Sequence, residues 1–245
     1  MSIDFALPPV IAHRGASAQA PENTLAAIAL AVEQGAKWIE IDVNRSVDGQ
    51  LFVHHDDTLN RCTNGQGYLV AAKATELTTL DAGSWFDPRF AGEPLPTLQQ
   101  VCNLLKPSGT GVNLEIKATP GADFELAQDV CRFLKQEWPG ELPVLPSSFS
   151  PLVLEEFRRQ LPNHPLGLLV SSVPADWQDW MQRYNCTTFH CAEAFATVEL
   201  CEAAKDGGYP LLCYTVNSIE RARELWDMGV NSVFSDIAHE LLASS

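Results

Sequence analysis

Basic residues are scarce in this chain, which has 16 lysines and arginines against 31 aspartates and glutamates and a formal net charge of −15 over 245 residues. This balance argues against binding to nucleic acid or to an anionic membrane surface, because both attract positively charged proteins. Long apolar runs are also missing, since none reaches the roughly 20 residues that a membrane span requires. The first ten residues lack a basic flank and contain Pro8 and Pro9, so neither a signal peptide nor a membrane anchor is expected. The expected partner is a small polar molecule.

Paired cysteine motifs are absent as well. The seven cysteines are odd in number, include no Cys-x-x-Cys pair and stand mostly among apolar neighbours. Their spacing does not fit a zinc site. We interpret them as buried free thiols in the reducing environment of the cytoplasm. They are Cys62, Cys102, Cys131, Cys186, Cys191, Cys201 and Cys213.

Short β-branched runs alternate with longer stretches of helical period, which is typical of a parallel sheet built from β-α units. Hydrophobic residues make up 46% of the sequence and charged residues 19%, so a large buried core is available. Eight such units predict an α/β fold, a (β/α)₈ TIM barrel formed by residues 1–245 as one domain. The expected strands are Val10–Arg14, Trp38–Val43, Val112–Lys117, Val144–Ser148, Leu166–Val170, Thr187–Cys191, Leu211–Val216 and Ser232–Phe234. The expected helices are Thr24–Gln34, Leu98–Leu105, Asp123–Gln136, Pro151–Gln160, Ala175–Tyr184, Val198–Asp206 and Ile219–Met228.

One segment departs from this alternation of strands and helices. Residues 46–96 contain a strand-like run, Gln50–His54, followed by a stretch rich in Gly, Thr and Asp. We expect a small insertion after the second strand, placed at the C-terminal face of the barrel, where it would shape a substrate pocket. Trp85 and Phe86 lie within it, and we expect them to bury the insertion's own core rather than to cover a substrate.

Charged residues stand inside the apolar strands. Glu40 and Asp42 share one face of the second strand, and Glu115 and Lys117 share one face of the third. If these faces point to the barrel mouth, three carboxylates converge there and repel one another unless a cation lies between them. Oxygen ligands favour Mg²⁺ or Ca²⁺ over zinc. The alternative is that each charge lies on the outer face or forms a salt bridge in a polar barrel interior.

Arg14 ends the first strand, and together with Lys117 it would place positive charge beside the metal. That arrangement suits a phosphoryl group, whose negative charge must be stabilised during displacement. His13 and one of the adjacent pair His54 and His55 are candidates for general acid and base, because imidazole titrates near neutral pH. Strand alternation allows only one of that pair to face the site, and a structural hydrogen bond is the alternative role for each histidine.

Six short motifs follow one another along the chain: His13-Arg14-Gly15, Pro21-Glu22-Asn23-Thr24, Glu40-Ile41-Asp42-Val43, His55-Asp56-Asp57-Thr58-Leu59-Asn60-Arg61, Leu114-Glu115-Ile116-Lys117 and Tyr214-Thr215-Val216-Asn217. In order and spacing they resemble the glycerophosphodiester phosphodiesterase family, and most closely its bacterial cytosolic type. The resemblance extends from about Val10 to Asp236, nearly the full chain. The departures, Cys62 where the family often has threonine and Tyr214 where it has tryptophan or tyrosine, bear on substrate fit.

The resemblance implies an enzyme that hydrolyses glycerophosphodiesters to sn-glycerol 3-phosphate and an alcohol with the help of a divalent cation, Mg²⁺ or Ca²⁺. It selects His55 over His54, because the family's histidine directly precedes the aspartate. The roles that it implies are acid-base catalysis for His13 and His55, metal binding for Glu40, Asp42 and Glu115, phosphate contact for Arg14 and Lys117, and a substrate-binding surface for Tyr214. We interpret Pro21 to Thr24 mainly as a helix start capped by Asn23 or Thr24, with a site role for Glu22 left open.

Other functions remain as alternatives. The same residues would serve a barrel phosphodiesterase that acts on lysophospholipids or sphingolipids, or a non-catalytic barrel that binds glycerophosphodiesters. A barrel of the metal amidohydrolase kind would need a His-x-His pair where this chain has His13-Arg14-Gly15. The sequence does not indicate the head group, the physiological metal, which histidine is the acid, the choice between water and a cyclic phosphate route, or the oligomeric state.

Overall fold

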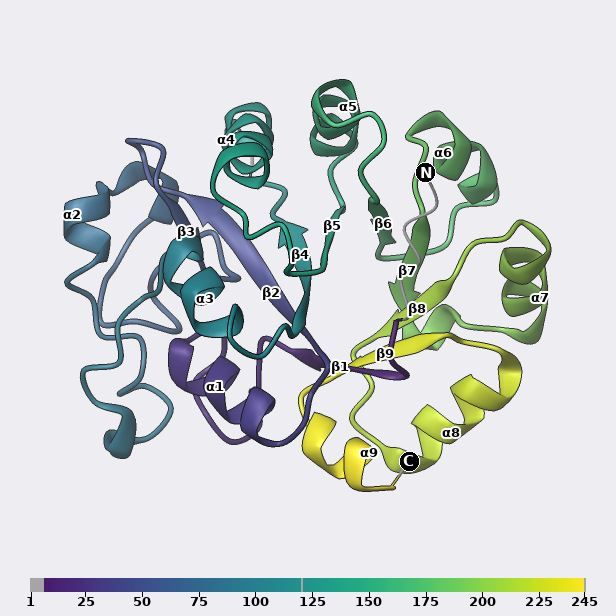
Figure 1. The fold of residues 1–245 in the computed structure, drawn as a ribbon, viewed down its shortest axis with the longest axis horizontal. Helices are drawn as coiled ribbons and strands as arrows, with labels where there is room; N and C mark the ends of the chain where they lie inside the picture. Colours follow the sequence, from purple (N-terminus) through teal and green to yellow (C-terminus); the bar gives the residue numbers. More distant parts are fainter. Residues whose placement is uncertain (1–6, 120, 245) are drawn as a thin grey trace.

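The computed structural model describes residues 7–119 and 121–244, and these residues form a ring of eight parallel strands surrounded by helices (Figure 1). The ring closes because β1 pairs with β9 on one side and with β2 on the other. Its strands are β1 (Val10–His13), β2 (Trp38–Arg45), β4 (Gly111–Ile116), β5 (Val144–Ser148), β6 (Gly167–Val170), β7 (Thr188–Ala192), β8 (Leu211–Tyr214) and β9 (Ser232–Ser235). The predicted TIM barrel is confirmed. Residues 1–6, on which the expectation about a signal peptide partly depends, lie outside the described residues.

Helices cover the outside of the ring, and several begin at a residue that caps their first turn. The side chains of Thr24, Ser150 and Ser218 accept hydrogen bonds from backbone N–H groups of the helices that follow them. Gly229, with φ of 105°, ends α8 as its position predicts. The helices are α1 (Leu25–Glu33), α3 (Leu98–Leu105), α4 (Asp123–Gln136), α5 (Pro151–Gln160), α6 (Trp177–Arg183), α7 (Val198–Asp206), α8 (Ile219–Met228) and α9 (Ala238–Ser244). Among the residues that the structure describes, no helix combines the length and apolarity needed to cross a membrane.

Two apolar clusters hold the barrel together. The larger one lies between the strands and the helices and includes Ile39 and Ile41 of β2. A smaller one contains inward-facing strand residues, namely Ile11, Trp38, Leu145, Leu212 and Phe234. Because side chains alternate along a strand, Glu40 and Asp42 follow Trp38 on the inner face of β2. The interior of the barrel therefore changes from apolar to charged toward the C-terminal ends of the strands.

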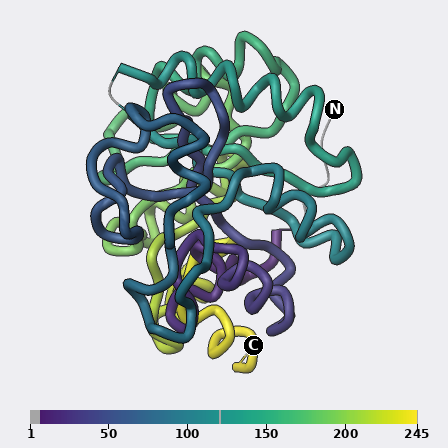
Figure 2. Tube along the Cα trace, turned by 90° about the vertical axis from the view of Figure 1, so that its left-hand side faces the viewer, coloured from purple at the N-terminus to yellow at the C-terminus, as the bar shows by residue number. Residues whose placement is uncertain are grey.

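The predicted insertion lies between β2 and α3 and is drawn in blue at the front of Figure 2. It contains β3 (Leu51–Val53), which pairs antiparallel with β2, the 3₁₀ helices Leu69–Ala71 and Pro88–Phe90, and the short helix α2 (Ala74–Leu77). Its own core consists of Phe52, Leu59, Leu69, Leu77, Ala82 and Leu95.

The expectation for Trp85 and Phe86 is wrong. Trp85 is 38% exposed, and both rings lie outside the core of the insertion. Instead Phe86 forms edge-to-face contacts with Trp85 on one side and with Phe90 on the other. The indole N–H of Trp85 donates a hydrogen bond to the carbonyl oxygen of Ala82, so the ring is held at the surface by its polar edge.

All seven cysteines are buried and none forms a disulfide, as predicted. Burial raises the pKa of several of their thiols, among them Cys102, to about 12. Thiols in this state are structural rather than reactive.

Candidate active site

The site begins at the turn that follows β1. Gly15 has φ of +83°, and a Cβ atom at this position would come within 2.7 Å of the backbone of Ala27 in α1. Only glycine allows the chain to turn here and α1 to pack so closely. Arg14 also has a positive φ of 55°, and its backbone N–H donates a 3.0 Å hydrogen bond to Glu40 Oε2. This turn brings both His13 and Arg14 to the mouth of the barrel.

Three carboxylates converge at the mouth, as the sequence predicts. The pairing of β2 with β4 sets Asp42 beside Glu115, and alternation places Glu40 on the same face. All three are buried, and one oxygen from each lies within 4.8 Å of the others. Burial, and then the charges of Asp42 and Glu115, raise the pKa of Glu40 well above its usual range. Burial and Asp42 likewise raise the pKa of Glu115.

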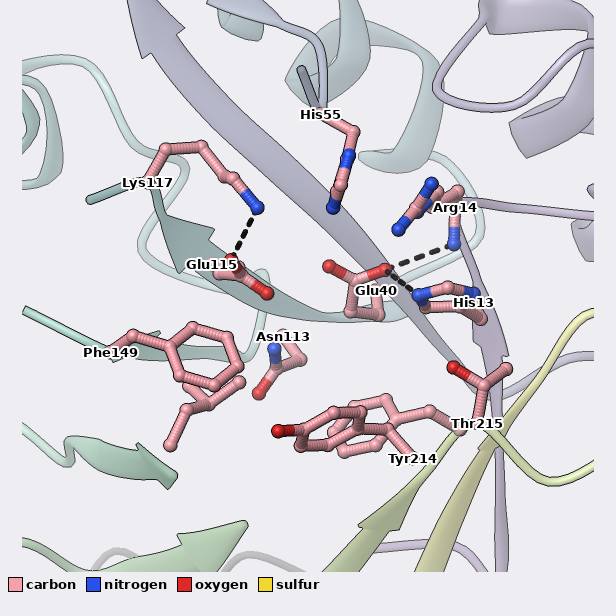
Figure 3. Close-up of a pocket in the computed structure, with 12 residues that line it drawn as sticks. His13, Arg14, Glu40, His55, Asn113, Glu115, Lys117, Phe149, Tyr214 and Thr215 are labelled. Carbon is pink, nitrogen blue, oxygen red and sulfur yellow. Dashed lines mark hydrogen bonds and ion pairs between the residues drawn. The ribbon is translucent and has the colours of Figure 1, made fainter. Parts of the chain in front are cut away.

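Lys117 and Arg14 lie beside this cluster. Lys117 Nζ is 2.7 Å from Glu115 Oε1 and 3.1 Å from Asp42 Oδ1, and Arg14 Nε is 3.4 Å from Asp42 Oδ2. Burial opposes ionisation of Asp42, but the two cations outweigh it and hold the pKa of this carboxyl far below its usual range. Positive charge is therefore adjacent to the carboxylates, while Figure 3 shows that Lys117 and Arg14 approach from different sides.

The donor set fits a hard divalent cation. All three candidate ligands offer carboxylate oxygens, which Mg²⁺ and Ca²⁺ prefer. Glu40 Oε1 is buried and has no hydrogen-bond partner among the described residues, which leaves an acceptor that a cation would satisfy. Glu40, Asp42 and Glu115 are the residues that would hold such an ion.

His13 belongs to a histidine-aspartate pair. Its Nδ1 atom lies 2.7 Å from Asp236 Oδ1, and a carboxylate at this distance accepts the Nδ1–H. The Nε2 atom then faces the carboxylates, 3.9 Å from Glu40 Oε2. Asp236 is half-buried, which opposes its ionisation, but hydrogen bonds from His13, Asn217 and Ser17 lower its pKa to about 2. The carboxylate therefore stays ionised and holds the ring of His13 in place.

His55 forms an equivalent pair with its sequence neighbour. Its Nδ1 atom is 2.7 Å from Asp56 Oδ1, and its ring points toward the carboxylates from above in the view of Figure 3. Burial lowers the pKa of His55, although the charge of Asp42 opposes this shift. His54 is buried elsewhere, with Nε2 2.9 Å from the carbonyl oxygen of Thr58. Only His55 of the adjacent pair faces the site.

A chain of ion pairs connects these groups outside the cluster. Arg61 donates hydrogen bonds of 2.7 to 2.8 Å to both Asp56 and Glu22. Glu22 in turn accepts a 2.7 Å hydrogen bond from Arg14. Of the Pro21 to Thr24 run, Glu22 thus supports the site, Asn23 binds Asp42 through its amide at 2.8 Å, and Thr24 alone caps α1. The sequence motifs include these residues without revealing their contacts.

A cavity of about 230 Å³, here named the mouth pocket, opens above the carboxylates and is lined by every predicted site residue except Asp42. Its volume lies below the ~300–1,000 Å³ of pockets for drug-sized ligands, so it suits a small group. The apolar part of its wall consists of Phe149, Leu169, Tyr214 and Phe234. The hydroxyl of Tyr214 donates a hydrogen bond to the carbonyl oxygen of Val170 at 2.8 Å. Because the hydroxyl is already bound, Tyr214 contributes the face of its ring to the pocket wall.

The lining residues that the prediction of the site did not include are Asn113, Phe149, Leu169, Thr215 and Phe234, and two of them, Phe149 and Asn113, make specific contacts. Phe149 follows β5 and contacts Tyr214 edge to face at 5.9 Å. Asn113 lies on β4, two residues before Glu115 and on the same inner face, and is 1% exposed. Its amide nitrogen donates to Ser147 Oγ at 3.0 Å, while its Oδ1 is buried without a partner among the described residues. The alternation rule that places Glu115 also places Asn113, so this position was accessible to sequence reasoning.

This protein is a barrel enzyme. Its TIM barrel carries buried carboxylates, basic side chains and two imidazoles, each bound to an aspartate, at the C-terminal mouth. A model of the glycerophosphoryl diester phosphodiesterase family matches residues 13–239. The chain belongs to this family, which confirms the resemblance that its motifs predict.

Similar proteins extend over nearly the whole chain. A glycerophosphodiester phosphodiesterase of Caldanaerobacter subterraneus subsp. tengcongensis is 35% identical over 237 residues, covering 95% of this chain and 96% of the relative. The structure of an Oleispira antarctica phosphodiesterase in complex with the product sn-glycerol-3-phosphate is 39% identical with a TM-score of 0.94, covering 97% of this chain and 96% of that one. A glycerophosphodiester phosphodiesterase from Agrobacterium tumefaciens is 29% identical with a TM-score of 0.79, covering 97% of this chain and all of that one.

Proposed function

We propose that this chain hydrolyses glycerophosphodiesters to sn-glycerol 3-phosphate and an alcohol, with Mg²⁺ or Ca²⁺ bound by Glu40, Asp42 and Glu115. The observation that carries the proposal is the convergence of two imidazoles and two basic side chains on one buried carboxylate cluster. The product found in the Oleispira antarctica phosphodiesterase supports the same reaction.

Four side chains of this chain would act on the phosphodiester. Arg14 and Lys117 would contact its oxygens and offset the charge that develops during displacement. His13 and His55 would transfer protons through Nε2, because Nδ1 of each ring is bound to an aspartate. A bound divalent cation would add Lewis-acid stabilisation of the phosphoryl charge.

The glycerol end would enter the mouth pocket. This space is small, and Asn113 supplies the buried acceptor Oδ1, which a glycerol hydroxyl would satisfy. Tyr214 would pack its ring against the carbon chain. We therefore assign Asn113 and Tyr214 to substrate binding rather than to proton transfer.

Replacing Asn113 by leucine is expected to raise KM for glycerophosphocholine by about tenfold with a smaller effect on kcat. The hydrogen bond to a glycerol hydroxyl is present before and during the reaction, so its loss weakens binding uniformly. Steady-state kinetics of the purified variant measures this effect. Bis(p-nitrophenyl) phosphate, which has no glycerol, is the matched control substrate, and an equal rise in its KM would contradict the assignment.

Replacing Asp236 by asparagine is expected to lower kcat by about 100-fold while KM changes less than threefold. The carboxylate keeps the proton of His13 on Nδ1 and the ring in its orientation, and a neutral amide does not fix that tautomer. Asp227→Asn, a change on the exposed face of α8, is the matched control and should retain full activity. An Asp236→Asn variant with normal kcat would show that this aspartate does not position His13.

We also propose that residues 1–245 form one domain, with the insertion at about 46–96, and that the protein works in the cytoplasm. Seven buried cysteines without a disulfide support a reducing compartment. Fractionation of the native host cells tests the location.

The direct test of function is release of sn-glycerol 3-phosphate from glycerophosphocholine by the purified protein, with and without EDTA and after Mg²⁺ or Ca²⁺ add-back. Release that EDTA abolishes and metal restores is the expected result. Release only from lysophospholipids would assign the chain to the related lipid phosphodiesterases. Saturable binding without product would assign it to the non-catalytic binders.

A further inference from the structure

A second cavity continues from the mouth pocket toward the insertion. It has a volume of about 600 Å³ and shares His55, Glu115, Lys117 and Phe149 with the mouth pocket. Beyond these shared residues its wall includes Asp57 and Tyr68. We refer to this space as the Asp57 groove. A diester whose phosphate lies beside Lys117 and whose glycerol fills the mouth pocket would have the Asp57 groove available for its other alcohol.

One carboxylate in the wall of this groove has no partner among the described residues. Asp57 is exposed, and its side chain makes no hydrogen bond or ion pair with any residue in the described part of the chain. Its neighbour Asp56 differs, because it binds both His55 and Arg61. Glu115, the third carboxylate of the groove wall, is paired with Lys117 at 2.7 Å, so among the described residues of the groove Asp57 is the carboxylate left to bind a cation.

The backbone holds Asp57 and Tyr68 side by side. Leu69 N–H donates a 3.0 Å hydrogen bond to the carbonyl oxygen of Asp57, and Thr58 pairs with Tyr68 as an antiparallel bridge. Tyr68 is 63% exposed, so its ring is open to a ligand. Phe149 brings a second aromatic ring to the groove. Aromatic rings beside a carboxylate attract quaternary and primary ammonium groups, by cation–π contact and by charge.

A third cavity, of about 450 Å³, leaves the mouth pocket on the side of His13 and offers nothing comparable. Its two carboxylates are already bound, Glu22 to Arg14 and Arg61, and Asp236 to His13 and Asn217. Its wall includes no phenylalanine, tyrosine or tryptophan. A cationic alcohol would therefore meet neither an unpaired carboxylate nor a phenyl, phenol or indole ring there.

We infer that the Asp57 groove receives the leaving alcohol and selects diesters with a cationic head group, choline or ethanolamine, over neutral ones such as glycerol or inositol. This inference rests on the proposed function and specifies its substrate class. Asp57 and Tyr68 are the residues that determine the selectivity, and neither takes part in proton transfer or metal binding.

The test compares kcat/KM for glycerophosphocholine and glycerophosphoglycerol, which carry the same single phosphate charge. The wild type should prefer glycerophosphocholine by about tenfold. Asp57→Asn and Tyr68→Leu should each reduce that preference by about three- to fivefold, consistent with one exposed charge pair or one cation–π contact. Asp179→Asn, an exposed change on α6, is the matched control and should leave the ratio unchanged.

The possible failures are distinguishable. Cleavage of both diesters without preference, or equal losses on both substrates in Asp57→Asn, overturns the assignment of the groove and leaves the proposed function standing. Absence of cleavage of every glycerophosphodiester overturns the proposed function. Calorimetry of glycerophosphocholine binding to the wild type and to Asp57→Asn then tests the role of the groove separately. Weaker binding by the variant supports the assignment of the groove to a cationic head group, and equal binding overturns it.

Discussion

Replacing His13 or His55 by alanine is expected to reduce turnover of glycerophosphocholine by about 1,000-fold while the barrel stays folded, because general acid-base catalysis typically contributes ~10²–10⁴ in rate. In both rings Nδ1 is bound to an aspartate and Nε2 is left for the substrate, so alanine removes the only atom that can carry the proton. The side chains of His13 and His55 are 15% and 35% exposed, but both line the mouth pocket and neither belongs to the apolar clusters, so truncation leaves the core packing in place.

Release of sn-glycerol 3-phosphate measures the loss, and circular dichroism checks the fold. His239→Ala on α9, outside the ring of strands, is the matched control and should keep near-normal activity. Near-normal turnover in His13→Ala or in His55→Ala would contradict the acid-base assignment for that residue.

Replacing Glu40 by glutamine is expected to have two effects of opposite sign. Turnover should fall by about 1,000-fold, because one of the three anionic ligands is lost. In EDTA, however, the thermal midpoint of the variant should equal or exceed that of the wild type. Glu40 is buried beside Asp42 and Glu115, and a neutral amide of the same shape relieves their repulsion while it still accepts the N–H of Arg14.

Addition of Mg²⁺ or Ca²⁺ separates these effects. The wild type should gain several degrees in thermal midpoint, because a ligand that binds only the folded state stabilises it, and Glu40→Gln should gain little. Glu202→Gln on the exposed face of α7 serves as control and should respond to metal like the wild type. A Glu40→Gln variant that kept metal-dependent turnover within tenfold of the wild type would remove Glu40 from the ligand set.

The barrel was predictable because strand and helix periods are local properties of the sequence. α3, α4, α5, α7 and α8 begin and end at the predicted residues, because all five are amphipathic and all but α4 start at a capping threonine or serine. α9 and α2 are absent from the prediction, and the four residues of α2 are too few to show a period. The surface position of Trp85 was also missed, because composition does not tell which apolar residues of an irregular segment reach its core.

The candidate site, like the fold, was predictable only in part. Alternation along the strands placed Glu40 with Asp42 and Glu115 with Lys117 on shared faces, and the motifs favoured the barrel mouth, where the structure brings all four together. Only the tertiary structure placed Asp236, which is 223 residues from His13 in the chain, beside its Nδ1 atom. Among the described residues, it also leaves Oδ1 of Asn113 and the carboxylate of Asp57 without partners. The physical reason is that periodicity decides which way a side chain points, whereas its partner depends on where the closing ring and the insertion bring distant segments together.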